Sequence, residues 1–211
     1  FDEAAKIRLE GGESAKLHPE QNSAWLERTA REVLDSVREA ESRVATHRNK
    51  EFDSTVVDLR ILAHLAQYHA RRIHAGMNYA LFTKSQDVNA LDEALRHERQ
   101  AIAAWQNIVE AAGDLYADDL MMGLRSAGLA GHWRDELAAL QKGLAAIEEQ
   151  RRQFRPKTTD APAIAHVPIR KTADEDLLVR ATIWGPDSIQ SARLVWHAGA
   201  SDRTEISMEP S

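Results

Sequence analysis

The sequence predicts a mainly α-helical protein, an antiparallel four-helix bundle followed by a partial, truncated β-sandwich of about four strands. Two observations lead to this prediction. Through most of residues 22–155, hydrophobic residues recur every three or four positions, which is the period of an amphipathic helix. From residue 164 onward they alternate with polar residues, which is the period of a β-strand.

The N-terminal segment, residues 1–21, holds two adjacent glycines and a His-Pro pair without sustained periodicity, so it predicts an irregular lead-in. Asn22 or Ser23 is a suitable N-cap for a first helix, because both side chains can accept a hydrogen bond from a free backbone N–H. The apolar positions that follow extend this helix to about residue 47.

A second helix can begin at Asp53 or Ser54 and extends to about residue 83. The first half of this helix is apolar around much of its circumference, so we expect the helix to be the most buried of the four. A third helix starts near Asp87. Short connections between helices of this length favour antiparallel packing in one bundle.

The fourth helix covers about residues 132–154, where leucine and isoleucine recur at helical spacing. Residues 117–131 connect the third and fourth helices and contain three glycines, and we make no prediction of their structure. The bundle therefore spans residues 22–155. A linker rich in proline and threonine is predicted over residues 156–163.

Residues 164–211 predict part of an immunoglobulin-like sandwich. The expected strands are 164–169, 177–184, 192–197 and 204–209. Four strands are about half of such a sandwich, and an incomplete sheet leaves an exposed edge. We therefore expect the chain to be an excerpt of a larger protein, cut within its second domain.

Composition narrows the classes of function. The net charge of −6 argues against a general nucleic-acid binder, which would carry a basic face. No apolar run reaches the roughly 18 residues needed to span a bilayer, so no membrane span is predicted. The absence of cysteine excludes disulfides, thiolate catalysis and cysteine-ligated metals.

Three histidines, His64, His69 and His74, lie in the second helix at intervals of five residues. Five residues turn an α-helix by roughly 140°, so the three rings cannot share one face. We therefore predict no metal site and no cofactor.

Several polar residues could form a site. The candidates as ligands or domain contacts are Arg60, His64, Tyr68, Arg72, Asp118, Asp119 and Trp184. Because Arg60–His64 and His64–Tyr68 are at i, i+4, they can form a polar seam in the second helix, meeting one of the aspartates. Alternatively, Tyr68, Arg72 and the aspartates belong to a surface contributed to a neighbouring catalytic domain. Adjacent carboxylates do not converge on one glycosidic bond, so we predict no catalytic residue.

Tryptophans could stack on sugar rings, so their expected positions matter. Trp25, Trp105 and Trp133 fall in the apolar stripes of their helices, which favours packing in the core. Trp184 lies opposite the apolar face of its strand and is the best exposed candidate for contact with carbohydrate.

The helical part resembles a known type of segment. The run from Val57 to Gly76, then Tyr116-Ala-Asp-Asp-Leu and Gly131-His-Trp-Arg-Asp, is similar to the helical segment late in large bacterial glycoside-hydrolase-like proteins related to the α-glucuronidases. In those proteins a catalytic barrel precedes the helices and a sandwich follows them. The resemblance implies a non-catalytic accessory role, packing against the chain's own catalytic domain, and export to the periplasm or the extracellular space. It supplies no catalytic residue.

Two other hypotheses stay open at this point. One is a free-standing helical module for protein–protein interaction, which would form a complex with a separate chain. The other is a small enzyme that uses Arg60, His64, Tyr68 and Asp119.

Overall fold

The computed structural model describes residues 1–10, 14–44, 48–121, 123–128, 130–155, 163–166, 181–184, 191, 193–197 and 203–207. Its helices are α1 (Asp2–Glu10), α2 (Pro19–Val44), α3 (Lys50–Ser85), α4 (Val88–Ala112) and α5 (Trp133–Gln153). The predicted mainly helical fold is confirmed.

The prediction of an irregular lead-in over residues 1–21 is wrong for Asp2–Glu10, which form α1. A helix this short is marginal in isolation, so tertiary packing has to stabilise it. Ala5 is fully buried in a cluster with Leu81 and Leu91, and this contact supplies that packing. Helix α2 begins at Pro19, before the predicted caps, because proline is well suited to the first helical position.

Side chains cap the N-termini of α3 and α4. Helix α4 begins next to Asp87, as expected, and Asp87 is its N-cap, with a carboxylate that accepts a hydrogen bond from the backbone N–H of Asn89 at 3.0 Å. Helix α3 begins earlier than predicted, because Asn49 accepts a hydrogen bond from Phe52 N at 2.8 Å and takes the capping role given to Asp53 or Ser54.

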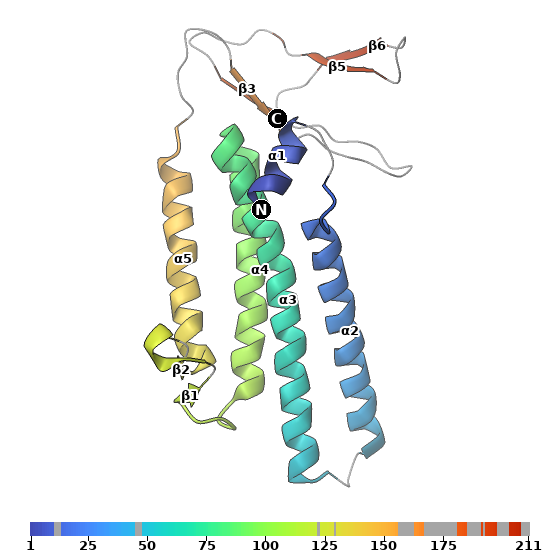
Figure 1. The fold of residues 1–211 in the computed structure, drawn as a ribbon, viewed down its shortest axis with the longest axis vertical. Helices are drawn as coiled ribbons and strands as arrows, with labels where there is room; N and C mark the ends of the chain where they lie inside the picture. Colours follow the sequence, from blue (N-terminus) through green and yellow to red (C-terminus); the bar gives the residue numbers. More distant parts are fainter. Residues whose placement is uncertain are drawn as a thin grey trace.

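The four long helices lie side by side in the order α2, α3, α4, α5, with successive helices antiparallel (Figure 1). Among the described helices, α2 has extensive contact with α3 alone, and α5 with α4 alone. A closed four-helix bundle also requires extensive contact between its first and last helices. The structure therefore confirms the helices and their antiparallel order, but not a closed bundle.

Most of the buried residues between α2 and α3 are small. Ser23, Ala30 and Val37, spaced by seven, are the buried residues of α2. On α3, Ala63 and Ala70 are buried, and Ala70 O accepts a hydrogen bond from Ser23 Oγ at 3.1 Å. Short side chains at these positions let the two helix axes approach closely.

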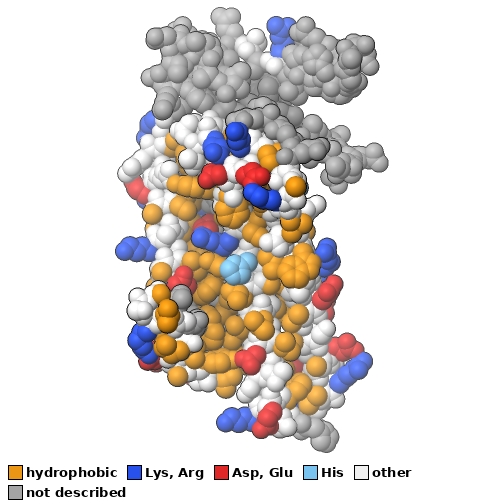
Figure 2. All heavy atoms as spheres, viewed as in Figure 1, with side chains coloured by type: hydrophobic (Ala, Val, Ile, Leu, Met, Phe, Trp, Pro, Cys, Tyr) orange, Lys and Arg blue, Asp and Glu red, His pale blue; other side chains and the backbone are white. Residues whose placement is uncertain are grey.

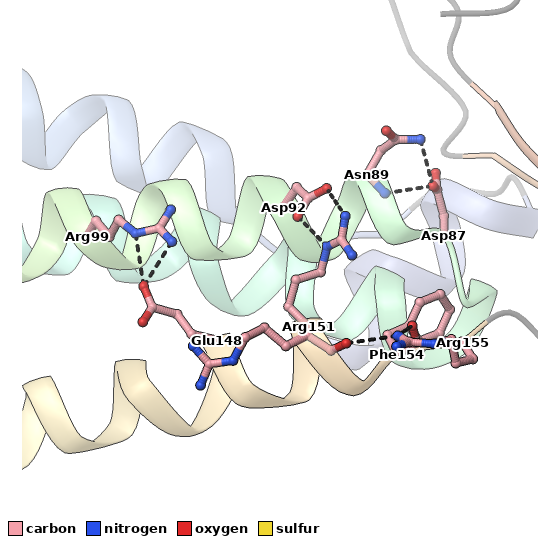
Figure 3. Close-up of polar contacts among 9 residues, drawn as sticks. Asp87, Asn89, Asp92, Arg99, Glu148, Arg151, Phe154 and Arg155 are labelled. Carbon is pink, nitrogen blue, oxygen red and sulfur yellow. Dashed lines mark hydrogen bonds and ion pairs between the residues drawn. The ribbon is translucent and has the colours of Figure 1, made fainter.

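The α4–α5 contact is more polar. Leu140 is the one buried residue of α5. Arg151 Nε donates to Asp92 at 2.6 Å, and Arg99 Nη2 donates to Glu148 at 2.9 Å, so two ion pairs join the helices (Figure 3). Exposed ion pairs of this kind contribute little to the free energy of folding, so α5 is held less firmly than the other long helices.

Between α4 and α5, where we made no prediction of structure, lie two short strands and one turn of 3₁₀-helix. These are β1 (Leu120–Met121), η1 (Arg125–Ala127) and β2 (Ala130–Gly131), with β1 and β2 antiparallel.

Strands occur in all four stretches predicted beyond the helices. They are β3 (Ala163–His166), β4 (Ala181–Trp184), β5 (Arg193–His197) and β6 (Arg203–Ser207). They pair antiparallel as β3–β4 and β5–β6, each a two-stranded sheet, so a four-stranded sandwich is not confirmed. Except for Ala163, the predicted linker 156–163 lies outside the described residues.

Candidate functional site

Two grooves of similar size follow the α2–α3 contact, and they differ in chemistry. The first, here called the apolar groove, has a volume of about 450 Å³ and is lined by Thr29, Glu32, Val33, Ser36, Val37, Ala40, Phe52, Thr55, Val56 and Leu59. The second, the polar groove, has a volume of about 460 Å³ and is lined by Glu27, Arg31, Leu34, Asp35, Arg38, Gln67, Arg71, Gln100, Ala103, Ala104 and Asn107.

The two grooves lie on opposite sides of the α2–α3 contact. On α2, Val33 and Ala40 line the apolar groove, whereas Arg31 and Arg38 line the polar groove. At 100° per residue, these two sets project to either side of the buried line through Ala30. The α2–α3 pair therefore has one apolar flank and one polar flank.

Large hydrophobic side chains extend the apolar flank beyond its groove. Trp25 is 53% exposed and Leu62 is 60% exposed, and each is one helical turn from a residue of the groove, Thr29 and Leu59 respectively. Figure 2 shows a face of the molecule on which hydrophobic side chains gather between α5 and α2, with most charged side chains around them.

Two predictions from the sequence are wrong here. Trp25 was expected in the core and is half exposed, while Trp105 and Trp133 pack against core clusters as expected. Helix α3 was expected to be the most buried helix, but α4 has 11 buried residues among its 25 and α3 has 9 among its 36. In the first half of α3, Leu59 and Leu62 are exposed. Because the helices lie in a row, nothing in the described chain covers the outer flank of α3 at these positions.

A third hollow, the tyrosine cavity, lies where α3 passes α4 and α5. Its volume is about 470 Å³, and its lining includes Tyr68, His69, Arg72, Tyr79, Glu98 and the N-terminal Phe1. Two predicted site residues, Tyr68 and Arg72, are thus brought together. The Arg72 guanidinium lies 5.9 Å from the ring centroid of Tyr68, and its Nη1 donates to Glu98 Oε1 at 2.5 Å.

The other polar candidates lie elsewhere. Arg60 pairs with Glu41 of α2 at 2.6 Å, and His64 Nδ1 lies 2.9 Å from Gln67 Oε1. Neither contact continues the seam that was predicted between them and Tyr68.

The two adjacent aspartates form ion pairs with nearby arginines, not with residues of α3. Asp118 pairs with Arg134, and Asp119 accepts two hydrogen bonds from Arg125 at 2.8 Å. The hydrogen bond from Arg125 lowers the pKa of the Asp119 carboxyl. Both aspartates are exposed at the β1–β2 segment, so they do not join Tyr68 and Arg72. Trp184 ends β4, in register with Ala163.

Sequence reasoning missed two residues of the tyrosine cavity, Glu98 and His69. Glu98 is buried, and the sequence did contain a signal: it follows Leu91 by seven residues and Leu95 by three, so it lies within the apolar stripe of α4. A carboxylate in that position needs a partner, which Arg72 provides. Burial, and secondly the charge of Arg72, lower the pKa of His69, so this ring is neutral at pH 7.

A stacked histidine pair joins α3 and α4. The ring centroids of His74 and His97 are 4.7 Å apart, with the planes inclined by 19°. Burial lowers the pKa of His97 to about 4, with Arg96 and His74 acting in the same direction. Burial also lowers the pKa of His74, so both rings are neutral at pH 7. Nδ1 of His97 has no hydrogen-bond partner in the described structure.

In the described part of the chain, no three His, Asp or Glu side chains are grouped so that they could hold a metal ion. No described helix combines the length and hydrophobicity of a membrane span.

Comparison of the chain with models of protein families, with curated proteins and with solved structures found no match in any of the three.

Proposed function

We propose that these helices form a non-catalytic accessory module of a larger carbohydrate-active, glycoside-hydrolase-like enzyme. In this proposal the apolar flank of α2 and α3 packs against the catalytic domain, and residues 164–211 begin an immunoglobulin-like sandwich. The observation that carries the proposal is the apolar flank itself, with its groove and the exposed Trp25, Leu59 and Leu62. Apolar patches of this kind on soluble proteins are typical of interaction sites.

Two further points support an accessory role over a catalytic one. The candidates for a small enzyme have four different surroundings: Arg60 pairs with Glu41, His64 contacts Gln67, Tyr68 lines the tyrosine cavity and Asp119 pairs with Arg125. General acid–base chemistry requires its groups within hydrogen-bond reach of one reacting bond. The resemblance of the helical run to segments of glycoside-hydrolase-like proteins suggests the kind of enzyme.

The test uses the longer gene product. Sequencing the gene on both sides of this segment should give an open frame that encodes a barrel-sized domain, and the full-length protein should hydrolyse members of a panel of aryl glycosides. Leu59→Lys with Leu62→Lys should then shorten the half-life of that activity at elevated temperature several-fold. The same pair in residues 1–211 alone should leave the unfolding midpoint unchanged, because both side chains are exposed there.

A matched control is Leu115→Lys with Leu124→Lys, two exposed leucines outside α2 and α3. An enzyme whose half-life is equally affected by both pairs would contradict the proposed interface. An open frame that encodes no catalytic domain would contradict the proposal as a whole.

The alternative is a module that binds a separate protein through the same flank. It is favoured by the form of the apolar groove, which lies between two helices, a shape that accepts the apolar face of an added amphipathic helix. In that case the Lys pair would abolish a complex with another chain and leave the enzyme's half-life unchanged.

A further inference from the structure

The tyrosine cavity has the size and the lining of a small-molecule site. At about 470 Å³ it lies within the range of known ligand pockets. Aromatic rings from Tyr68, Tyr79 and Phe1 form much of the lining, together with Ile73 of α3 and Ile147 of α5. An apolar pocket with a few polar groups is the usual composition of such sites.

Some polar groups of the lining have no protein partner in the part of the chain that the structure describes, although the Tyr79 hydroxyl donates to Gln150 Oε1 at 3.0 Å. Within the described residues, the Tyr68 hydroxyl and the His69 ring make no hydrogen bond, and Arg72 donates only through Nη1. Tyr68 is 8% exposed as a whole residue, whereas His69 and Arg72, which also line the cavity, are exposed. These three side chains, within five residues of α3, therefore offer hydrogen-bonding groups that a bound molecule can engage.

The cation of the cavity is fixed in place. The side chain of Glu98 is 4% exposed and holds Arg72 from α4, while the Tyr68 ring lies beneath the guanidinium. The Nη2 and Nε groups remain free to donate, and a planar guanidinium matches a carboxylate by two parallel hydrogen bonds. The neutral His69 adds a hydrogen-bonding group without a second charge.

We propose that the tyrosine cavity binds a small carboxylate with a ring as its body, the carboxylate on Arg72 and the ring between Tyr68 and Tyr79. The ring gains from contact with the aromatic walls, and the Tyr68 hydroxyl donates a hydrogen bond to the carboxylate or to a ring substituent. Glu98 serves as a positioning residue, because it orients the guanidinium without reaching the ligand. This site does not depend on the proposed accessory role.

The experiment is a titration of residues 1–211 with benzoate, followed by ¹H–¹⁵N NMR, with benzamide as the uncharged analogue of the same shape. We expect saturable shifts at residues of the cavity, with a Kd of about 1 mM or tighter, and at least about tenfold weaker binding of benzamide. Equal binding of the two probes, or no saturable binding of benzoate, would overturn the proposal.

Substitutions test whether benzoate binds in the tyrosine cavity. Tyr68→Phe should weaken benzoate binding several-fold, and Arg72→Gln should abolish it. Because Arg72→Gln leaves a buried carboxylate unpaired, the paired change Arg72→Gln with Glu98→Gln provides a second version with no unpaired charge. Arg31→Gln, which removes an arginine from the polar groove, is the control and should leave affinity unchanged. Undiminished binding to both Tyr68→Phe and the Arg72/Glu98 pair would refute the site.

Discussion

The two grooves beside the α2–α3 contact are close in volume and opposite in chemistry. The polar groove is lined mainly by charged and amide side chains, and Arg71 pairs there with Glu27 at 2.8 Å. The apolar groove is lined mainly by aliphatic side chains and Phe52, and exposed Trp25 and Leu62 extend it.

The difference indicates how each flank meets its surroundings. A polar groove is hydrated at little cost in free energy, so the polar flank does not require another surface to cover it. Apolar area gains about 25 cal/mol per Å² when it is removed from water, so the apolar flank is stabilised when another surface covers it. The same two helices thus present one solvated side and one side suited to a partner.

The largest expected effect separates core leucines from leucines of the apolar flank. Leu91→Ala should lower the free energy of unfolding by about 2–5 kcal/mol, because the side chain is fully buried beside Leu81 and Phe82. Leu62→Ala should change it by no more than about 0.5 kcal/mol, since Leu62 is exposed. Urea unfolding followed by circular dichroism measures both. A cost for Leu62→Ala equal to that for Leu91→Ala would place Leu62 in the core and remove the contrast between the flanks.

A second effect concerns His97, buried at the α3–α4 contact. Its pKa in the folded chain is about 4, below the value near 6.5 of an unfolded chain, so the unfolded state binds more protons between these values. The contribution of the neutral ring to stability is therefore complete above about pH 6.5 and is lost as the pH falls through about 4, a change of about 1–3 kcal/mol.

The measurement is urea unfolding of the wild type and of His97→Gln across this pH window. We expect a flatter dependence in the variant, because its amide does not titrate. Parallel curves would mean that His97 is protonated as easily in the folded state as in the unfolded state.

The smallest effect tests whether the polar flank is only a solvated surface. The side chains of Arg71 and Glu27 are about one-third exposed, so a double-mutant cycle with alanine should give a coupling energy of about 0.2–1 kcal/mol that falls with added salt. A coupling above about 2 kcal/mol, insensitive to salt, would make this flank a structural contact and weaken the comparison.

Local signals in the sequence were sufficient for part of the fold. The start of α4 near Asp87 and the helical period of α2, α3 and α4 depend on neighbours in the chain, and these elements were predicted. Helix α1 was missed because it depends on burial of Ala5 against residues far along the sequence.

The candidate site shows the same limit. Tyr68 and Arg72 were identified, but their partner Glu98 comes from another helix, so only the packing of α3 on α4 reveals it. The exposure of Trp25 and Leu62 could not be predicted either, because helical periodicity marks apolar positions without saying which of them a neighbour covers.

The most direct test of the central claim is carbene footprinting of residues 1–211 alone and within the longer protein that the proposed function requires, read by mass spectrometry. If the apolar flank packs against a catalytic domain, labelling at Trp25, Leu59 and Leu62 should fall strongly in the longer protein. Labelling at Gln67, Gln100 and Asn107 of the polar groove should stay the same. Equal labelling of the apolar flank in both proteins would contradict the account.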